Sequence, residues 1–192
     1  MADKTGRRVG ESNTREQIIA AARELFAQRG FGATPLRAIA ALAGVDVALI
    51  PYYFGNKRGL FVAAMEIPVD PGDVIRRAAA GPRAELGTRI ARSFLTTWDD
   101  PATGTAMQGV LRSATTDETA GRGFGEFLSD EMLPLAAREL GVPIDTVRAA
   151  GSMLFGLATL RYLVGAPAFT SPTVDELVAT FGPRLQAVID AG

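Results

Sequence analysis

The stretch from Thr34 to Lys57 constrains the fold of this chain most strongly, because it reads as two short helices joined at a glycine. Thr34 followed by Pro35 predicts a helix start, with the threonine side chain as cap and proline in the first helical position. Apolar residues then recur at three- and four-residue spacing up to Gly44, which can adopt the left-handed conformation that ends a helix. The pattern therefore predicts one helix ending at Gly44 and another close behind it.

The second helix is expected over about residues 46–50, with Asp46 as its cap. Two helices joined by so short a turn must cross steeply, which is the helix-turn-helix arrangement, whose second member can lie in a DNA major groove. The outward face, with Val47 and Ala48, is small and mostly uncharged, so it can approach base edges. Tyrosine hydroxyls and the ammonium of Lys57 can hydrogen-bond phosphates. The alternative is an ordinary buried helix pair within an all-α domain.

The motif T-x-x-x-x-I-A-x-x-A-G-V, followed by an aromatic run closing in F-x-x-K, is present in order and in spacing. It consists of Thr34, Ile39-Ala40, Ala43-Gly44-Val45, Tyr52-Tyr53-Phe54 and Lys57. Upstream, Thr14-Arg15-Glu16-Gln17 is similar to a capping box that opens a helix ending at Gly30. Residues of about 12 to 72 thus resemble the N-terminal domain of the TetR/AcrR family of transcriptional regulators.

The resemblance implies an all-α fold, with a DNA-binding domain over 12–72, its helix-turn-helix at about 35–54, and a ligand-binding and dimerisation domain over 73–192. It also implies the residues that contact an operator. They are Thr34, Arg37, Asp46, Val47, Ala48, Tyr52, Tyr53 and Lys57. Pro51 departs from the family, which usually carries a tyrosine, another aromatic residue or histidine there. Because proline lacks an N–H and disfavours a helical residue before it, we expect the recognition helix to end or kink at Pro51.

Charge is divided between the two parts of the chain. Residues 1–58 carry nine Lys or Arg against five Asp or Glu, whereas the remaining residues carry eleven against sixteen. A basic segment that coincides with the motif is the electrostatic footprint of phosphate binding. The charge pattern therefore supports DNA binding at one end of the chain, although a charge run is more often only a solvated surface.

The composition excludes several kinds of chemistry. The chain has 192 residues, 47% of them hydrophobic, and contains neither histidine nor cysteine. A zinc site, a disulfide and a histidine-based catalytic triad are therefore ruled out, and we expect no metal and no cofactor. No apolar run is long enough to span a bilayer and no signal pattern is present, so a cytoplasmic protein is expected. An enzyme would have to rely on carboxylates such as Asp99, Asp100 and Glu131, which show no catalytic spacing.

Helical periodicity continues to the end of the chain, and no alternating strand pattern is present. The expected helices cover 57–66, 73–80, 83–99, 105–114, 118–140, 145–164 and 174–189, the last capped by Thr173. The helix over 145–164 is apolar almost all round, so every side must be covered. In the resembled family the last two helices pair across a two-fold axis, which implies a homodimer through 145–164 and 174–189 and a palindromic operator. The alternative is a central helix buried within its own domain.

The family also implies a pocket for a small-molecule effector between the DNA-binding domain and the dimer helices. The expected lining is a set of apolar and aromatic residues: Phe94, Trp98, Met107, Leu111, Phe127 and Met132. An aromatic and methionine stripe at helical spacing is equally consistent with plain core. A mainly apolar effector that releases the protein from DNA is expected, with repression as the family default. A helical protein-interaction module that does not bind DNA remains the alternative function.

Overall fold

The computed structural model describes the backbone of residues 5–192 and the side chains from residue 13 onward. Helices fill this range and no strand occurs in it, as the sequence predicts. The helices are α1 (Thr5–Arg29), α2 (Leu36–Ala43), α3 (Leu49–Phe54), α4 (Lys57–Ala64), α5 (Pro71–Ala79), α6 (Leu86–Asp99), α7 (Pro101–Thr116), α8 (Glu118–Phe127), α9 (Leu133–Leu140), α10 (Ile144–Ala158), α11 (Pro167–Thr170) and α12 (Val174–Asp190). A short 3₁₀ turn, η1 (Arg83–Glu85), precedes α6, and π-helical turns η2 (Leu128–Met132) and η3 (Thr159–Leu163) follow α8 and α10.

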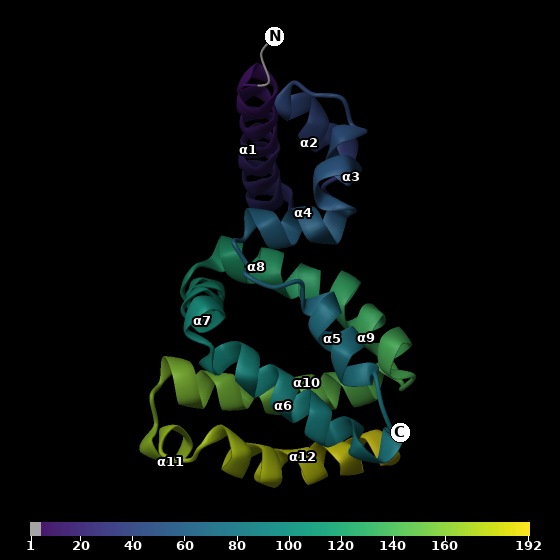
Figure 1. The fold of residues 1–192 in the computed structure, drawn as a ribbon, viewed down its shortest axis with the longest axis vertical. Helices are drawn as coiled ribbons and strands as arrows, with labels where there is room; N and C mark the ends of the chain where they lie inside the picture. Colours follow the sequence, from purple (N-terminus) through teal and green to yellow (C-terminus); the bar gives the residue numbers. More distant parts are fainter. Residues whose placement is uncertain (1–4) are drawn as a thin grey trace.

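The helices form two parts, which we call the head (α1–α4) and the body (α5–α12) (Figure 1). The boundary expected at residue 72 falls within the first turn of α5. In the head, apolar side chains of α1, α2 and α4 meet in one core that includes Ile18, Phe26, Ile39 and Phe61. This core continues into the body through Phe127. Burial of these side chains from water is the main force that holds the head together.

Helix α1 begins earlier than expected. The capping box at Thr14 predicts a start there, but α1 runs unbroken from Thr5, so this prediction is wrong. The helix can continue through Thr14, because a polar residue inside a helix is only mildly unfavourable. The helix ends just before Gly30, as expected, and its side chains of Ile18 and Phe26 are buried.

In the body, α6 and α12 pack closely, with α10 beside them (Figure 1). A Cβ atom added to Gly87 would lie 2.5 Å from the carbonyl oxygen of Gly182 and 2.4 Å from the backbone nitrogen of Gln186. Only glycine at position 87 therefore permits this approach of the two backbones. Helix α12 begins as expected, because Thr173 and Glu176 form a reciprocal capping box.

Aspartates set the start of three body helices. Asp70, Asp100 and Asp117 each accept a backbone N–H of the first turn of α5, α7 and α8. Helices α5 and α7 thus begin at Pro71 and Pro101, earlier than the expected residues 73 and 105, because a proline in the first turn loses no hydrogen bond. Among the described residues, no helix is both long and apolar enough to cross a membrane.

Candidate functional site

The turn between α2 and α3 has the geometry that the sequence predicts. Gly44 is left-handed (φ 68°), and its N–H donates to carbonyls of the last turn of α2. Val45 then donates to the Ala40 carbonyl at 3.0 Å, which closes the turn. Asp46 Oδ1 accepts the backbone N–H of Ala48 at 2.7 Å and so stabilises the turn before α3. It does not cap α3 as predicted, because the cap position is Ala48 and no side chain bonds there. The head therefore carries a helix-turn-helix.

The recognition helix differs from its prediction. A helix over 46–50 that ends at Pro51 is wrong, because α3 spans Leu49–Phe54 and Pro51 occupies its third position. The first N–H groups of a helix have no acceptor within it, so the missing N–H of Pro51 breaks no helical bond. The Val47 carbonyl, four residues before Pro51, instead accepts from Ile50 at 3.2 Å. Proline thus lies near the beginning of the recognition helix rather than at its end.

Most of the expected DNA contacts lie on one accessible surface. The exposed fractions of Val47 and Tyr52 are 45% and 71%, unusual values for such large apolar side chains in a folded domain. Asp46 and Ala48 are exposed beside them, and Tyr53 is half-buried with its ring 4.9 Å from that of Tyr52. We call Asp46, Val47, Ala48, Tyr52 and Tyr53 the α3 surface.

Arg37 on α2 remains available to DNA. Its side chain is exposed and makes no hydrogen bond or ion pair with any residue that the structure describes. On α1, the guanidinium of Arg15 lies 5.3 Å from the centre of the Phe54 ring, so a second positive charge lies against α3. Both charges suit phosphate oxygens, which position a protein on DNA without reading its sequence.

Thr34 has a structural role instead of the expected contact with DNA. Its side chain is fully buried, and its hydroxyl donates to the carbonyls of Gly30 at 2.7 Å and Leu25 at 3.2 Å. It does not cap α2, because the cap position is Pro35 and no side chain bonds there. Thr34 therefore satisfies the carbonyls at the end of α1, and both roles predicted for it are wrong.

Lys57 is held within the protein and does not extend freely toward DNA. Its ammonium donates to the Gly32 carbonyl at 3.2 Å and lies 4.6 Å from the centre of the Phe31 ring. Partial burial lowers its pKa, although the nearby Asp130, Glu131 and Glu126 act in the opposite direction. These carboxylates belong to the body, so the structure places Lys57 at the joint between head and body. Its side chain is only partly buried, and its phosphate contact stays a prediction.

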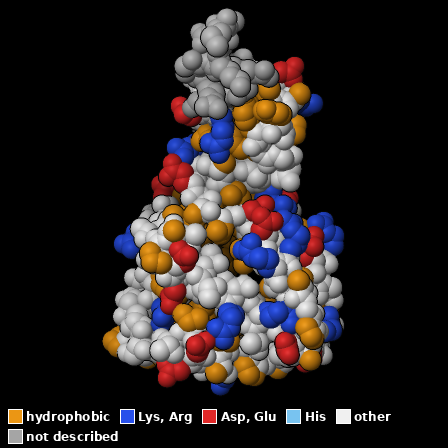
Figure 2. All heavy atoms as spheres, viewed as in Figure 1, with side chains coloured by type: hydrophobic (Ala, Val, Ile, Leu, Met, Phe, Trp, Pro, Cys, Tyr) orange, Lys and Arg blue, Asp and Glu red, His pale blue; other side chains and the backbone are white. Residues whose placement is uncertain are grey.

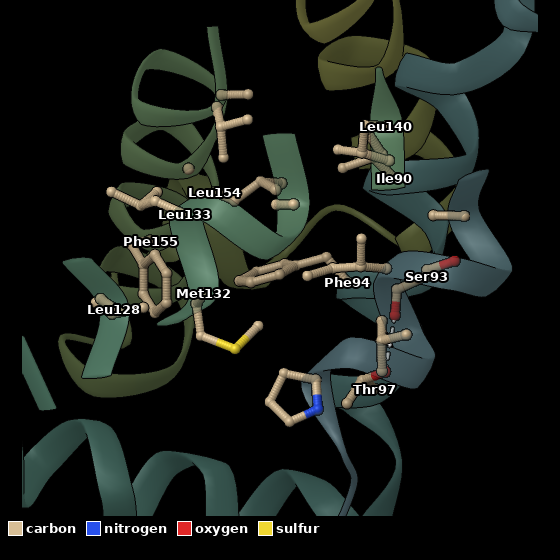
Figure 3. A pocket seen from close by; sticks show the side chains of 18 of the residues that line it. Ile90, Ser93, Phe94, Thr97, Leu128, Met132, Leu133, Leu140, Leu154 and Phe155 are labelled. Atoms are coloured by element: carbon tan, nitrogen blue, oxygen red, sulfur yellow. Dashed lines mark hydrogen bonds between the residues drawn. The ribbon is translucent and has the colours of Figure 1, made fainter. Parts of the chain in front are cut away.

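A cavity of about 230 Å³ lies in the body. All six residues predicted to line a pocket line it: Phe94, Trp98, Met107, Leu111, Phe127 and Met132. Ile90, Phe94 and Thr97 of α6 lie across the cavity from Leu128, Met132 and Phe155 (Figure 3). The surface of the molecule is hollowed at this level (Figure 2). The expected stripe is thus at once core and cavity wall.

Part of the cavity wall lies outside the helices, so helical periodicity could not predict it. Ile67, Val69 and Pro71 line the cavity from the segment that connects α4 to α5, which we call the linker (residues 65–70), and from the first residue of α5. In the linker, Glu66 takes a left-handed conformation (φ 55°) and pairs with Arg23 of α1. The break in the helix at these residues, signalled by Pro68 and Pro71, is the sequence feature that turns the linker toward the cavity.

The chemistry of the cavity is apolar. Among the described residues, no charged side chain lines it, and its hydroxyl-bearing side chains are those of Ser93, Thr97 and Thr146. Thr97 donates its hydroxyl to the Ser93 carbonyl at 2.8 Å (Figure 3). Burying a charged ligand without a partner is costly, so the cavity suits a neutral and mainly apolar molecule.

The acidic residues considered for catalysis form ion pairs, hydrogen bonds or helix caps within the protein. Asp99 pairs with Arg161 at 3.2 Å and accepts the hydroxyl of Tyr162, while Asp100 caps α7. Glu131 pairs with Arg58 at 3.3 Å. No group of three or more acidic side chains that could hold a metal ion occurs among the described residues. These carboxylates therefore take part in contacts within the fold.

The fold and the site define the class of protein: a helix-turn-helix DNA-binding protein whose body encloses an apolar cavity. Residues 18–64 match the family model "Bacterial regulatory proteins, tetR family", and residues 84–189 match "Tetracyclin repressor-like, C-terminal domain". The chain therefore belongs to the TetR family of transcriptional regulators, which is a family of DNA-binding proteins and not of enzymes.

Solved and curated relatives agree with this family. A TetR-family regulator from Streptomyces coelicolor A3 is 35% identical, with a TM-score of 0.55, over 94% of this chain and 97% of that chain. The transcriptional dual regulator CecR of Shigella flexneri is 35% identical over 66% of this chain and 55% of its own length. The transcriptional repressor NicS of Pseudomonas putida is 38% identical over 33% of this chain and 30% of its own length. The chain thus matches about half or less of the length of these two curated relatives.

Proposed function

We propose that the protein binds a palindromic operator as a homodimer, represses transcription there, and leaves the DNA when a neutral, mainly apolar molecule occupies its cavity. The observation that carries this proposal is the position of the cavity. Its wall includes Phe127, whose ring stacks on that of Phe61 in the head, so a ligand would lie one side chain away from the DNA-binding unit.

The exposed faces of α10 and α12 support a dimer. Small side chains occupy one accessible face of each helix, at a spacing of three or four residues. They are Ala149, Ser152 and Gly156 on α10, and Ala179, Pro183 and Ala187 on α12. Small residues at helical spacing let another helix approach closely. Both helices lie at the end of the molecule opposite the α3 surface (Figure 1), so a two-fold axis between two copies would leave both heads free.

A dimer is also what selectivity requires. The α3 surface is small, and one such helix buries too little area to discriminate strongly among sites. Two heads related by a two-fold axis read two half-sites, whose spacing is about one helical turn of DNA or a multiple of it. The operator is therefore expected to be a palindrome.

Selection of bound sequences from random DNA tests the DNA-binding part of the proposal. The expected product is a palindrome that the full chain binds far more tightly than a single half-site. Recovery of sequences with no common motif would contradict specific binding and favour a helical protein-interaction module. A reporter gene placed behind the recovered palindrome, with and without the protein, then separates repression from activation.

Sedimentation tests the dimer. Gly156→Arg places a long charged side chain on the exposed face of α10, where no atom lies within 4 Å of the added Cβ, so the subunit fold can accept it. Loss of the dimer with retained helix content is expected, whereas Thr105→Arg on the exposed surface of α7 should leave the dimer intact. A monomeric wild-type chain would contradict the dimer.

A further inference from the structure

Arg58 of the head forms ion pairs with two segments of the chain that line the cavity. It belongs to α4, and its side chain is only 11% exposed. One guanidinium nitrogen lies 3.3 Å from Glu131 Oε1, and Nε lies 3.4 Å from Asp70 Oδ1. A charge that is largely removed from water depends on such partners, so a shift of either carboxylate changes the free energy of this site strongly.

Each partner of Arg58 adjoins a residue that lines the cavity. Asp70 lies between Val69 and Pro71, and Glu131 precedes Met132. Two separate segments, the linker and the π-helical turn η2, therefore each carry a side chain that lines the cavity. In each segment, the neighbouring residue is a carboxylate that pairs with Arg58. A molecule that displaces the backbone at Val69 or Met132 moves one of these carboxylates relative to Arg58.

The arrangement around Arg58 is incompletely satisfied in this structure. Its Nε is buried and makes no aligned hydrogen bond, although Asp70 lies within ion-pair distance. A buried donor without an acceptor is rare, and it favours any rearrangement that supplies one. The turn η2, which carries Glu131, is a second feature of the joint that suits a rearrangement. Turns of this π-helical kind insert one extra residue into a helix and occur often at functional sites.

Neighbouring contacts place the same segment of the body against the turn that leads into α2. The carboxylate of Glu126 accepts the N–H of Gly32 at 3.3 Å, and a Cβ on Gly30 would overlap that carboxylate. A Cβ on Gly32 would lie 2.9 Å from Asp130 Oδ2. The body thus holds both ends of the helix-turn-helix unit, through Arg58 on α4 and through the glycines between α1 and α2.

We propose that Arg58 is the positioning residue that transmits occupancy of the cavity to the head, by way of Asp70 and Glu131. This inference rests on the proposed function, since it presumes that a molecule in the cavity changes DNA affinity. Coupling of this kind requires two arrangements of the joint with different affinity for the ligand. Removal of the charge at position 58 should disconnect the two sites while leaving each able to bind.

The test measures the dissociation constant for the selected operator DNA by fluorescence anisotropy, with and without N-phenyl-1-naphthylamine, a neutral apolar dye that fluoresces when buried. For the wild-type chain, saturating dye is expected to weaken DNA binding about fivefold or more. In Arg58→Gln the ratio should fall to nearly one, while dye fluorescence still reports a filled cavity. Glu131→Gln should reproduce this loss; Asp70 is unsuitable, because it also caps α5.

Arg122→Gln is the matched control, because Arg122 is an exposed arginine on α8 whose one ion pair among the described residues is with Glu118 of the same helix. It should keep the wild-type ratio. A wild-type ratio in both Arg58→Gln and Glu131→Gln would overturn the inference and leave the proposed function standing. Bound dye without effect on the DNA affinity of the wild-type chain would instead overturn ligand control itself, and this inference with it. Thermal melts monitored by circular dichroism show which variants are folded. If Arg58→Gln is not folded, the ratio measured for Glu131→Gln tests the inference.

Discussion

The ring of Phe127 lies 4.4 Å from that of Phe61 and nearly parallel to it, at an angle of 16°. Phe127 lines the cavity and belongs to α8, whereas Phe61 belongs to α4 of the head. Phe31, from the turn before α2, meets both rings edge-on at 5.4 Å and 5.2 Å. Head and body therefore share one aromatic core, and they cannot move independently without separating these rings.

Truncation of Phe127 should destabilise the whole chain. Its side chain is 1% exposed, so Phe127→Ala is expected to lower the free energy of unfolding by about 3–5 kcal/mol. Phe124 is partly exposed and has a single ring neighbour, Phe155, at 6.1 Å, so Phe124→Ala should cost clearly less. Urea denaturation of both variants checks the order, and equal losses would contradict a shared core centred on Phe127.

Glycine at position 87 should be required by the crossing of α6 and α12. A Cβ there meets backbone atoms that cannot turn away, so Gly87→Ala is expected to destabilise the protein by about 1–3 kcal/mol. Gly109→Ala on α7 is the control, because no atom lies within 4 Å of its added Cβ. Alanine there should stabilise the helix by roughly 0.5–1 kcal/mol. If Gly87→Ala left the free energy of unfolding unchanged, the backbones of α6 and α12 would not lie as close as the structure shows.

Arg37 and Lys57 should differ in their effect on DNA binding, although both are basic residues of the head. Arg37→Gln is expected to reduce the slope of log affinity against log salt by about two, because the dimer loses one phosphate contact at each head. Lys57→Gln should leave that slope unchanged, since its ammonium is bound to Gly32. Anisotropy titrations over a range of salt concentrations measure both slopes. A reduced slope in Lys57→Gln would show that Lys57 contacts a DNA phosphate.

Thr34 should affect stability without contacting DNA. Thr34→Val keeps the shape of the side chain but removes the donor to the carbonyls of Leu25 and Gly30. We expect a loss of about 1–3 kcal/mol in the free energy of unfolding, because a buried acceptor is left unsatisfied. The affinity of the folded variant for DNA should equal that of the wild-type chain, and a weaker affinity would indicate a direct phosphate contact.

Tyr162 should make stability depend on pH in the alkaline range. Burial, followed by the hydrogen bond to Asp99 and the charge of Asp99, raises the pKa of Tyr162 above its ordinary value of 10.0. The folded chain therefore holds the phenolic proton more tightly than the unfolded chain, and this contribution is complete below pH 10 and lost as pH rises toward the folded pKa. The difference in unfolding free energy between wild type and Tyr162→Phe should shrink above pH 10. A difference independent of pH would contradict the link to Asp99.

Local patterns were sufficient for most of the fold. The helix over 83–99, the last two long helices, the glycine stop at Gly44 and the cap at Thr173 depend on residues close in sequence, so periodicity and capping rules predict them. The early start of α7, the two π-helical turns and α11 were not predicted. Pro51 shows where such rules fail, since its effect depends on whether it lies early or late in a helix. In the structure, Asp46 and Ala48 form a turn before the helix begins, and this turn places Pro51 early in α3.

The functional side chains were predicted less well where distant residues decide their environment. Thr34 and Lys57 match the family motif, yet their partners are set by the fold of α1 and by the carboxylates of the body. The linker wall of the cavity and the partners of Arg58 also come from segments far apart in the chain. The apolar lining was predictable because large apolar side chains at helical spacing must face the interior, whether that interior is filled or hollow.

Equilibrium binding of the full chain to its selected DNA, at low and at roughly physiological salt, tests the central claim most directly. We expect tight binding at low salt and a linear fall of log affinity with log salt, with a slope of several units, because two heads release counterions from several phosphates. Failure of any DNA to be retained at low salt, by a chain that is folded and dimeric, would contradict a DNA-binding regulator.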